Sequence, residues 1–325
     1  MRAIVITEFG GPEVLALRDV PVPVPQRGEA RVRVRATAVN RADLVQRLGA
    51  YPAPPGVPKD IPGLEFAGEV DALGEGATGV AVGDRVFGLV GGGAYAEYVI
   101  VHSRELARIP DALSFTDAAA IPEAFLTAYD AIVTRGRLAS GETLLVSAVG
   151  SGVGTAAVQI ARAIGARSIG TARSEDKLAR AKELGMDVGV VAKDGKFADA
   201  VLSAAPEGVD VVLELVGGDY VAEDVKCVAL QGRIVLVGLM AGATANVDLR
   251  AVMFKRAEIH GTVLRSRPIE DKISAARVFA RRVVPLVARG ALRPVVDAVM
   301  PLEDAAKAHE IVGRNTTFGK VVLTL

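Results

Sequence analysis

A glycine-rich turn between a predicted strand and a predicted helix is the strongest chemical signal in the sequence. In TLLVSAVGSGVGTAAVQIARAIGA, residues 143–166, an apolar run leads into Gly150, Gly152 and Gly154 and then into a helix that should stop at Gly165. Glycines let the backbone approach a pyrophosphate closely, and the free N–H groups at a helix start face the anion. The spacing is G-x-G-x-G rather than G-x-G-x-x-G, so the turn could also serve packing alone.

The residues after the next predicted strand indicate which dinucleotide would bind. An acidic residue about 20 positions beyond the first glycine favours NAD, because it binds the ribose 2′-OH. This chain has Arg173 and Ser174 there, with Lys177 one helical turn further on. Cations suit a 2′-phosphate, so we predict NADPH rather than NADH. Alternatively, Ser174 is an ordinary N-cap and both cations are solvated, with Glu175 and Asp176 diluting their field.

The segments around this turn alternate between apolar runs and stretches of helical character. Continuous apolar runs are typical of a parallel sheet that helices cover on both faces. The sequence therefore predicts a doubly wound α/β unit with the glycine turn at the start of a helix. The predicted strands are 143–149, 167–172, 188–192, 209–216, 233–239 and 258–264, and the predicted helices are 153–164, 175–184 and 220–230.

The rest of the chain has a different pattern. Residues 1 to about 110 contain short strands broken by glycine and proline, which is an all-β pattern. From Ser114, a predicted N-cap, apolar residues at helical spacing continue through 115–135, with a kink at Pro122. The last part predicts a helix at about 269–289, a strand at 293–299, a helix near 303–312 and a strand at 319–325.

Composition narrows the class of protein. A length of 325 residues predicts two domains. Lys and Arg number 38, as do Asp and Glu, so no net charge attracts nucleic acid or anionic membranes. The single cysteine, Cys227, cannot form an internal disulfide, and no spacing for a structural metal occurs. No secretory leader is evident, and no apolar run reaches the roughly 18–20 residues of a membrane helix, so we expect a cytoplasmic protein.

Six segments carry a resemblance to a known family: NRADLVQRLGAYPAPPG, PGLEFAGEV, AAAIPEAFLTAYDAI, SGVGTAAVQIARAIGA, ALQGRIVLVGLMAG and VLRSR. Together with the order of the regions, they resemble the medium-chain dehydrogenase/reductase superfamily. The resemblance is strongest to its zinc-independent NADPH:quinone oxidoreductases, the group of zeta-crystallin and its tumour-suppressor-inducible relative, and spans nearly the whole chain. It implies a GroES-like, β-rich catalytic domain from residues 1–123 and 264–325, and a Rossmann domain from residues 124–263.

The resemblance also bears on metal binding. Zinc-dependent members have a cysteine where this chain has Asn40, and a histidine where it has Leu64. A catalytic zinc needs three protein ligands beside an open position, and Cys227 and the three histidines lie elsewhere. We therefore expect no metal, and hydride transfer from NADPH to a quinone. Two alternatives remain open: reduction of activated double bonds, as in 2-alkenals or enoyl thioesters, and NADPH binding with little turnover.

Four residues are predicted at the catalytic centre. In the family, residues matching Asn40 and Asp43 face the nicotinamide end, although a helix cap would also explain them. Tyr51 lies in the loop over the active site and could donate to a substrate oxygen or stack on a quinone, or merely pack on prolines. The Ser151 hydroxyl could reach cofactor or substrate, or simply be tolerated in a tight turn.

The resemblance extends to the cofactor contacts. Thr127 is similar to a threonine behind the nicotinamide ring, or bonds back to a helix carbonyl. Gly238 and Leu239 end a strand at the carboxyl edge, where α/β ligands bind, and Arg265 and Arg267 could reach the cofactor or face solvent. The predicted cofactor residues are Thr127, Gly150, Ser151, Gly152, Val153, Gly154, Arg173, Ser174, Lys177, Gly238, Leu239, Arg265 and Arg267.

Two further expectations follow from the resemblance and from the edge of the sheet. Ala192 stands where relatives have a tyrosine near the 2′-phosphate, so a stacking contact is lost, and Lys193 could offset it partly by charge. The partners should be a small quinone or activated carbonyl compound and a second copy of the chain. We predict a homodimer through the strand at 258–264, because an open apolar edge would invite aggregation.

Overall fold

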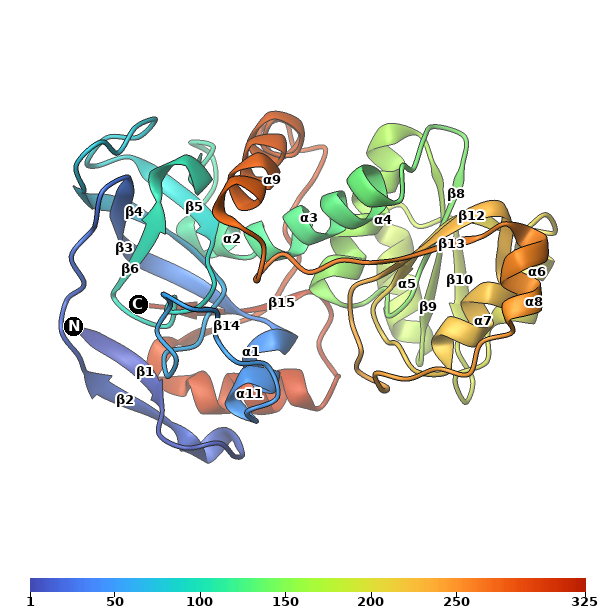
Figure 1. The fold of residues 1–325 in the computed structure, drawn as a ribbon, viewed down its shortest axis with the longest axis horizontal. Helices are drawn as coiled ribbons and strands as arrows, with labels where there is room; N and C mark the ends of the chain where they lie inside the picture. The colour runs from blue at the N-terminus through green and yellow to red at the C-terminus, as the bar shows by residue number, and fades with distance from the viewer. The chain divides into compact units, whose positions relative to one another are not determined.

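The computed structural model describes all 325 residues, and the chain divides into two compact units. Unit 1 contains residues 1–126 and 264–325, and unit 2 contains residues 127–263. In the sequence, unit 2 is therefore inserted into unit 1. Figure 1 labels most of the helices and strands of both units, and its colours run along the chain from blue at the N-terminus to red at the C-terminus.

Unit 2 is built on a six-stranded sheet in which every pairing is parallel, in the order β10-β9-β8-β11-β12-β13. The order reverses between β8 and β11, and ligands of such sheets bind at the carboxyl ends of the strands beside the reversal. The strands are β8 (Thr143–Val146), β9 (Arg167–Ala172), β10 (Val188–Val191), β11 (Val209–Glu214), β12 (Val228–Leu236) and β13 (Glu258–Gly261), and the helices are α4 (Gly152–Ile164), α5 (Glu175–Glu183), α6 (Ala198–Ala204), α7 (Tyr220–Cys227) and α8 (Leu249–Lys255).

Unit 1 is mainly antiparallel. Its larger sheet has the order β14-β15-β3-β4-β5-β7, with β6 also paired to β3, and only β14 and β15 are parallel. Side chains of β3 alternate between buried and exposed along its first half, as one covered face requires. The strands are β3 (Glu29–Val39), β4 (Glu65–Leu73), β5 (Arg85–Leu89), β6 (Tyr98–His102), β7 (Ala107–Arg108), β14 (Val296–Pro301) and β15 (Lys320–Thr324), and β1 (Arg2–Ile6) and β2 (Leu15–Asp19) form a separate pair.

The predicted fold class, a GroES-like domain with a Rossmann sheet, is confirmed, but several predicted boundaries are wrong. The strand expected at 258–264 ends at Gly261, and the helix expected at 220–230 ends at Cys227, where β12 begins. The helix expected at 269–289 is two helices, α9 (Ile269–Arg282) and α10 (Val284–Ala288), since Pro285 cannot donate a helical hydrogen bond. The pattern did not predict α6 or α8. Near 303–312, a 3₁₀ turn, Leu302–Asp304, precedes α11 (Ala305–Gly313).

The helical stretch after residue 114 breaks as predicted. The Ser114 Oγ accepts the Asp117 N–H at 3.0 Å and caps α2 (Phe115–Ala119). Helix α3 (Pro122–Tyr129) begins at the proline, whose missing N–H costs nothing in a first turn, and continues as a π-helix over Asp130–Arg135. The remaining helix of unit 1 near the site is α1 (Arg41–Arg47). None of the helices has the length and apolar character needed to span a membrane.

Candidate active site

The predicted glycine turn joins β8 to α4. Ser151 is the N-cap of α4, and its Oγ accepts the Gly154 N–H at 3.0 Å. A Cβ on Gly154 would lie 2.6 Å from the Val149 carbonyl oxygen, so only glycine fits there. The first N–H groups of α4 have no carbonyl partner within the helix, which suits them to bind an anion. The helix ends at Gly165, as predicted, in the left-handed conformation.

A second close approach lies at the carboxyl edge of the same sheet. A Cβ on Gly238 would lie 2.3 Å from the Leu215 carbonyl oxygen, so the segment after β12 passes directly beside the turn after β11. The Ala241 N–H donates to the Val216 carbonyl at 2.7 Å and fixes this arrangement. Leu239, between these contacts, is 55% exposed. The edge therefore offers a flat backbone surface with an open apolar side chain beside it.

A buried pair of carboxyl groups, Glu214 and Asp224, underlies this edge. The Glu214 Oε1 accepts the Gly217 N–H at 2.6 Å and also the N–H of Val216, which holds the turn after β11. Both side chains are fully buried, and three of their four oxygens have no donor around them. Burial raises the pKa of both groups, and the charge of Glu214 raises the pKa of Asp224 further. Burial therefore disfavours the charged form of both carboxyl groups, and that of Asp224 most strongly.

The predicted phosphate-binding cations lie at the start of α5. Arg173 is exposed and Lys177 is half-buried. Ser174 occupies the N-cap position, but its side chain makes no capping hydrogen bond. Instead, its hydrogen bond to the Asp176 carboxylate lowers the pKa of that group. The geometry therefore does not support the alternative interpretation, in which the Ser174 side chain caps α5.

Tyr220, at the start of α7, is an aromatic residue that the sequence analysis missed. Its ring packs on Phe197, with the centroids 5.2 Å apart. Burial raises the pKa of Tyr220, and the positive charge of Arg173 opposes that rise. Ala192 is 5% exposed within the apolar core, so its position offers little surface to a ligand. One feature of the sequence could have pointed to Tyr220. It is the Gly217-Gly218 pair, which lies just before this residue and directly after a predicted strand.

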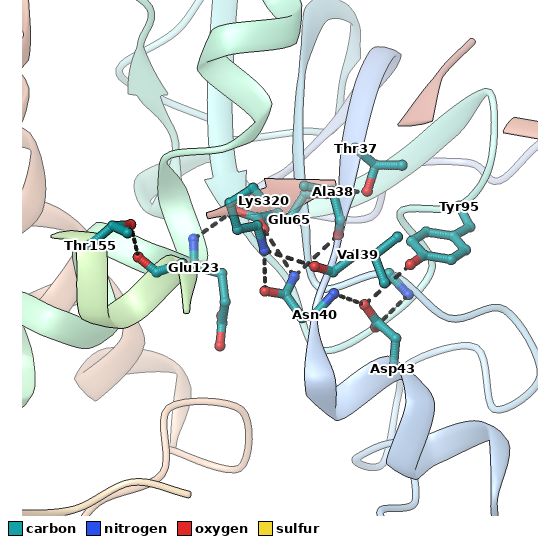
Figure 2. Close-up of polar contacts among 12 residues, drawn as sticks. Thr37, Ala38, Val39, Asn40, Asp43, Glu65, Tyr95, Glu123, Thr155 and Lys320 are labelled. Atoms are coloured by element: carbon teal, nitrogen blue, oxygen red, sulfur yellow. Dashed lines mark hydrogen bonds and ion pairs between the residues drawn. The ribbon is translucent and has the colours of Figure 1, made fainter. Parts of the chain in front are cut away.

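In unit 1, Asn40 belongs to a buried ionic network that Figure 2 shows. The Lys320 ammonium lies 2.7 Å from the Glu65 Oε1, donates to the Val39 carbonyl at 3.0 Å, and donates to the Asn40 Oδ1. The Asn40 Nδ2 donates to the Glu65 Oε1 at 2.9 Å and to the Ala38 carbonyl at 3.2 Å. Both amide hydrogens of Asn40 are thus used within the protein, which leaves the side chain as an acceptor only.

The same network receives the start of α3. The second carboxylate oxygen of Glu65, Oε2, accepts the Glu123 N–H at 2.8 Å. Glu65 is fully buried and Lys320 is 5% exposed, so this ion pair is shielded from water. With three acceptors around the ammonium and three donors around the carboxylate, the pair has the complete set of partners that burial of charge requires.

Asp43 anchors a second buried chain of hydrogen bonds. Its carboxylate accepts the backbone N–H groups of Asn40 at 2.8 Å and Gly63 at 3.1 Å, and the Tyr95 hydroxyl at 3.3 Å. The Tyr95 hydroxyl also lies 3.2 Å from the His309 Nε2. Burial raises the pKa of Asp43 to about 6, and burial lowers the pKa of His309 to about 3. The N-x-x-D pair is therefore a structural anchor as well as a candidate site.

His309 gives the protein an acid-sensitive core. The unfolded chain takes up a proton at His309 below pH 6.5, whereas the folded chain does so only near pH 3. Stability is therefore lost as the pH falls through this range, by about 2 kcal/mol between pH 6.5 and 5. The variant His309→Gln should lack this loss in urea unfolding at pH 7.5 and 5. Asp43, whose pKa is raised and whose effect has the opposite sign, is present in both proteins, so parallel pH profiles would contradict the assignment.

Tyr51 is held by Arg265 within unit 1. The Arg265 guanidinium lies over the Tyr51 ring, 4.8 Å from its centroid, and its Nη1 donates to the Tyr51 carbonyl at 3.1 Å. Its Nε donates to the Gly91 carbonyl at 2.7 Å, and its Nη2 donates to the Gln46 Oε1. Burial raises the pKa of the Tyr51 phenol, which therefore stays protonated at neutral pH. Arg265 is 6% exposed, and all three nitrogens of its guanidinium donate to residues of unit 1.

The structure groups the predicted residues by unit. Asn40 and Asp43 meet in the buried networks, and Tyr51 meets Arg265. In unit 2, the ends of β8 and β11 are joined where the Ser147 Oγ accepts the Leu215 N–H at 2.6 Å, next to the glycine turn. Thr127, the first residue of unit 2, is buried in α3, and Arg267, in unit 1, is half-buried.

At the positions of the zinc ligands in zinc-dependent proteins, this chain has other side chains. Leu64, where zinc-dependent proteins have a histidine, is an apolar side chain that is 3% exposed. Asn40 and Glu65 already surround the Lys320 ammonium. Nowhere do three histidine, cysteine, aspartate or glutamate side chains come together as a metal would require. The donor set at this position therefore fits a protein cation rather than zinc.

Comparison with family models matches both parts of the chain. Residues 26–111 match the alcohol dehydrogenase GroES-like domain, and residues 152–281 match the zinc-binding dehydrogenase domain. The rat and human proteins named quinone oxidoreductase are 35% and 33% identical, and each alignment covers 100% of this chain and 98% of the relative. The human synaptic vesicle membrane protein VAT-1 homolog is 30% identical over 99% of this chain and 86% of its own length.

Solved structures show the same architecture. A quinone oxidoreductase from Pseudomonas syringae has a TM-score of 0.89 at 30% identity, covering 100% of this chain and 99% of its own. A mycobacterial protein in complex with NADPH has a TM-score of 0.89 at 29% identity, and the match covers both chains fully. A protein described as an NAD-dependent alcohol dehydrogenase has a TM-score of 0.87 at 37% identity, again over both whole chains.

Proposed function

Because the chain belongs to the medium-chain dehydrogenase/reductase family of oxidoreductases, in its quinone oxidoreductase branch, we propose that it transfers hydride from NADPH to quinones without a metal ion. The observation that carries the proposal is the donor set around Asn40. A buried ammonium, that of Lys320, neutralises the site where zinc-dependent relatives gather metal ligands. Such a site can reduce acceptors that are electrophilic without a Lewis acid, and quinones are the main class of these.

The residues of unit 2 fit a dinucleotide. Gly150, Gly152, Val153 and Gly154 would hold the pyrophosphate at the start of α4, where the tight packing of Gly154 leaves room for no side chain. Gly238, Leu239 and Thr127, which all lie in unit 2, would face the nicotinamide half. When bound, NADPH supplies the hydride, and the chain's own residues orient it and exclude water. We propose unit 2 as the dinucleotide-binding domain and unit 1 as the catalytic domain.

The preference for NADPH over NADH rests on the start of α5. Arg173 and Lys177 offer two cations to a 2′-phosphate, and Arg173 stands about 20 positions beyond the first glycine, where an NAD-preferring site has an acidic residue. The charge of Arg173 acts on the pKa of Tyr220, and this residue offers a ring face near the adenosine side that Ala192 cannot. The NADPH complex of the mycobacterial relative supports the same choice.

The proposed reaction is tested with enzyme freed of metal by a chelator. NADPH oxidation is followed by absorbance with para-quinones, ortho-quinones and 2-alkenals as acceptors. We expect rapid oxidation with quinones, slow oxidation with alkenals, and no change when zinc is added back. A rate that depends on zinc, or the absence of affinity for NADPH, would refute the proposal. Oxidation that is faster with alkenals would favour the double-bond reductases instead.

We also propose a homodimer and a cytoplasmic location. β13 pairs only with β12, so its other edge is open. The adjacent helix α8 exposes Leu249 by 76%, Met253 by 68% and Phe254 by 68%, which is an apolar surface suited to a second copy. Cys227 is buried, and burial raises its pKa, so it fits a reducing compartment in which no disulfide is needed.

The dimer is tested by changing this apolar surface. Wild-type protein at micromolar concentration should sediment as a dimer, and the double variant Met253→Glu/Phe254→Glu should sediment as a monomer, because two carboxylates would be buried without partners. An exposed position elsewhere, Val82→Glu, is the control, since Val82 is 63% exposed in unit 1. A monomeric wild type would contradict the proposal.

A further inference from the structure

Arg265 contacts one end of the loop that carries Tyr51 directly, and it is linked to the other end through Gln46. Besides its bonds to the ring and carbonyl of Tyr51, it binds the Gln46 side chain. The Gln46 Nε2 in turn donates to the Lys59 carbonyl at 3.3 Å. Residues 51 and 59 are therefore both tied to one buried guanidinium, directly or through a single amide.

The middle of this loop rests on a bare backbone surface. A Cβ on Gly91 would lie 3.0 Å from a Val57 methyl group, and one on Gly92 would lie 3.4 Å from the other. Arg265 reaches this same surface, because its Nε donates to the Gly91 carbonyl at 2.7 Å. The guanidinium thus joins the loop to the segment that supports it.

Only an arginine can make this set of contacts. A guanidinium has five N–H donors in a plane and a flat face that stacks on an aromatic ring, whereas an ammonium has three donors and no face. The N–H groups at the edge of the Arg265 guanidinium donate to Gly91, Tyr51 and Gln46. Its flat face lies over the Tyr51 ring. Few of its donors remain for a cofactor phosphate.

We propose that Arg265 is the positioning residue that holds Tyr51 as one wall of the acceptor site, and that it is not a cofactor ligand; this rests on the proposed function. Because the guanidinium covers one face of the Tyr51 ring, the opposite face and the hydroxyl are what a substrate can contact. A flat ring of fixed orientation receives a planar aromatic acceptor by stacking, which an aliphatic alkenal cannot match. Arg265 therefore favours planar quinones through Tyr51.

The first arm of the test needs no ligand and no activity. Amide hydrogen exchange is measured over residues 51–60 in the wild type, in Arg265→Met, and in the control Arg281→Met, an exposed arginine of α9. We expect at least about tenfold faster exchange in Arg265→Met and no change in the control. If Arg265→Met does not fold, Arg265→Lys, which keeps the charge and loses the fork, is used instead. Unchanged exchange in the variant that folds would overturn the proposal.

The second arm separates the acceptor from the cofactor. For Arg265→Met we expect the KM for 1,4-naphthoquinone to rise about tenfold, with the Kd for NADPH, from fluorescence titration, within about twofold of the wild type. In a Tyr51→Ala background, the same change should add nothing, because Arg265 acts through Tyr51. A Kd for NADPH that rises about tenfold with unchanged loop exchange would make Arg265 a cofactor ligand. A wild type that reduces no quinone would refute the proposed function, while the exchange arm still reports on the loop.

Discussion

Replacing Lys320 with methionine should lower the free energy of unfolding by about 3–5 kcal/mol, the cost of leaving a buried carboxylate without its cation. Lys320 is 5% exposed, and the Glu65 carboxylate beside it is fully buried. Methionine has nearly the same length, so the space is filled and the missing charge dominates the effect. Urea unfolding at neutral pH measures the loss.

A double variant distinguishes charge from packing. Glu65→Gln combined with Lys320→Met removes both charges, so it should unfold at a higher urea concentration than Lys320→Met alone. The control is the exposed ion pair of Arg137 and Glu258, whose charged atoms lie 2.8 Å apart and are open to solvent. Arg137→Met should cost less than about 1 kcal/mol. Equal losses in the buried and exposed pairs would contradict the role given to Lys320.

Replacing Arg173 and Lys177 together with alanine should weaken NADPH binding by about 100-fold, since each contact of a cation with the 2′-phosphate contributes about tenfold or more. NADH has a hydroxyl where NADPH has this phosphate, so its affinity should change little. Fluorescence titration with each dinucleotide, at one fixed ionic strength, measures both dissociation constants. The two variants with single substitutions should each lose part of the preference.

The matched control for this pair is Lys182→Ala, which removes an exposed cation from the same helix, α5. It should leave both affinities unchanged, because Lys182 lies near the opposite end of the helix. If the double variant weakens NADPH and NADH equally, the cations act on the pyrophosphate or on folding, and the assignment of the 2′-phosphate site is wrong.

The features that sequence analysis predicted well are local in the chain. The turn from β8 into α4, the cap at Ser114 and the break at Pro122 are each fixed by neighbours within a few residues. The buried ionic network could not be predicted, because it joins residues that are far apart in the chain. Lys320 and Asn40 are separated by 280 residues. No periodicity or spacing pairs residues at that separation.

Charged residues near predicted strand ends were harder to interpret. Arg265 follows a strand of unit 2 in sequence, and that order alone could not predict its contacts with Tyr51 and Gly91 in unit 1. The sequence shows only that a cationic residue is present at this position. Which residues it contacts depends on how the chain folds back into unit 1. Glu214 and Asp224 were missed because acidic residues at a strand end and on a helix usually face solvent.

The raised pKa of Asp224 affects the net charge of the molecule. The formal net charge of zero, with 38 acidic and 38 basic side chains, counts every carboxyl group as ionised. Burial raises the pKa of Asp224 well above its ordinary value, so the folded chain holds a proton at this carboxyl up to a higher pH than the unfolded chain does. Folding therefore adds positive net charge over the pH range in which the folded and unfolded states differ at this carboxyl, and this shifts the isoelectric point of the folded chain upward from that of the unfolded chain.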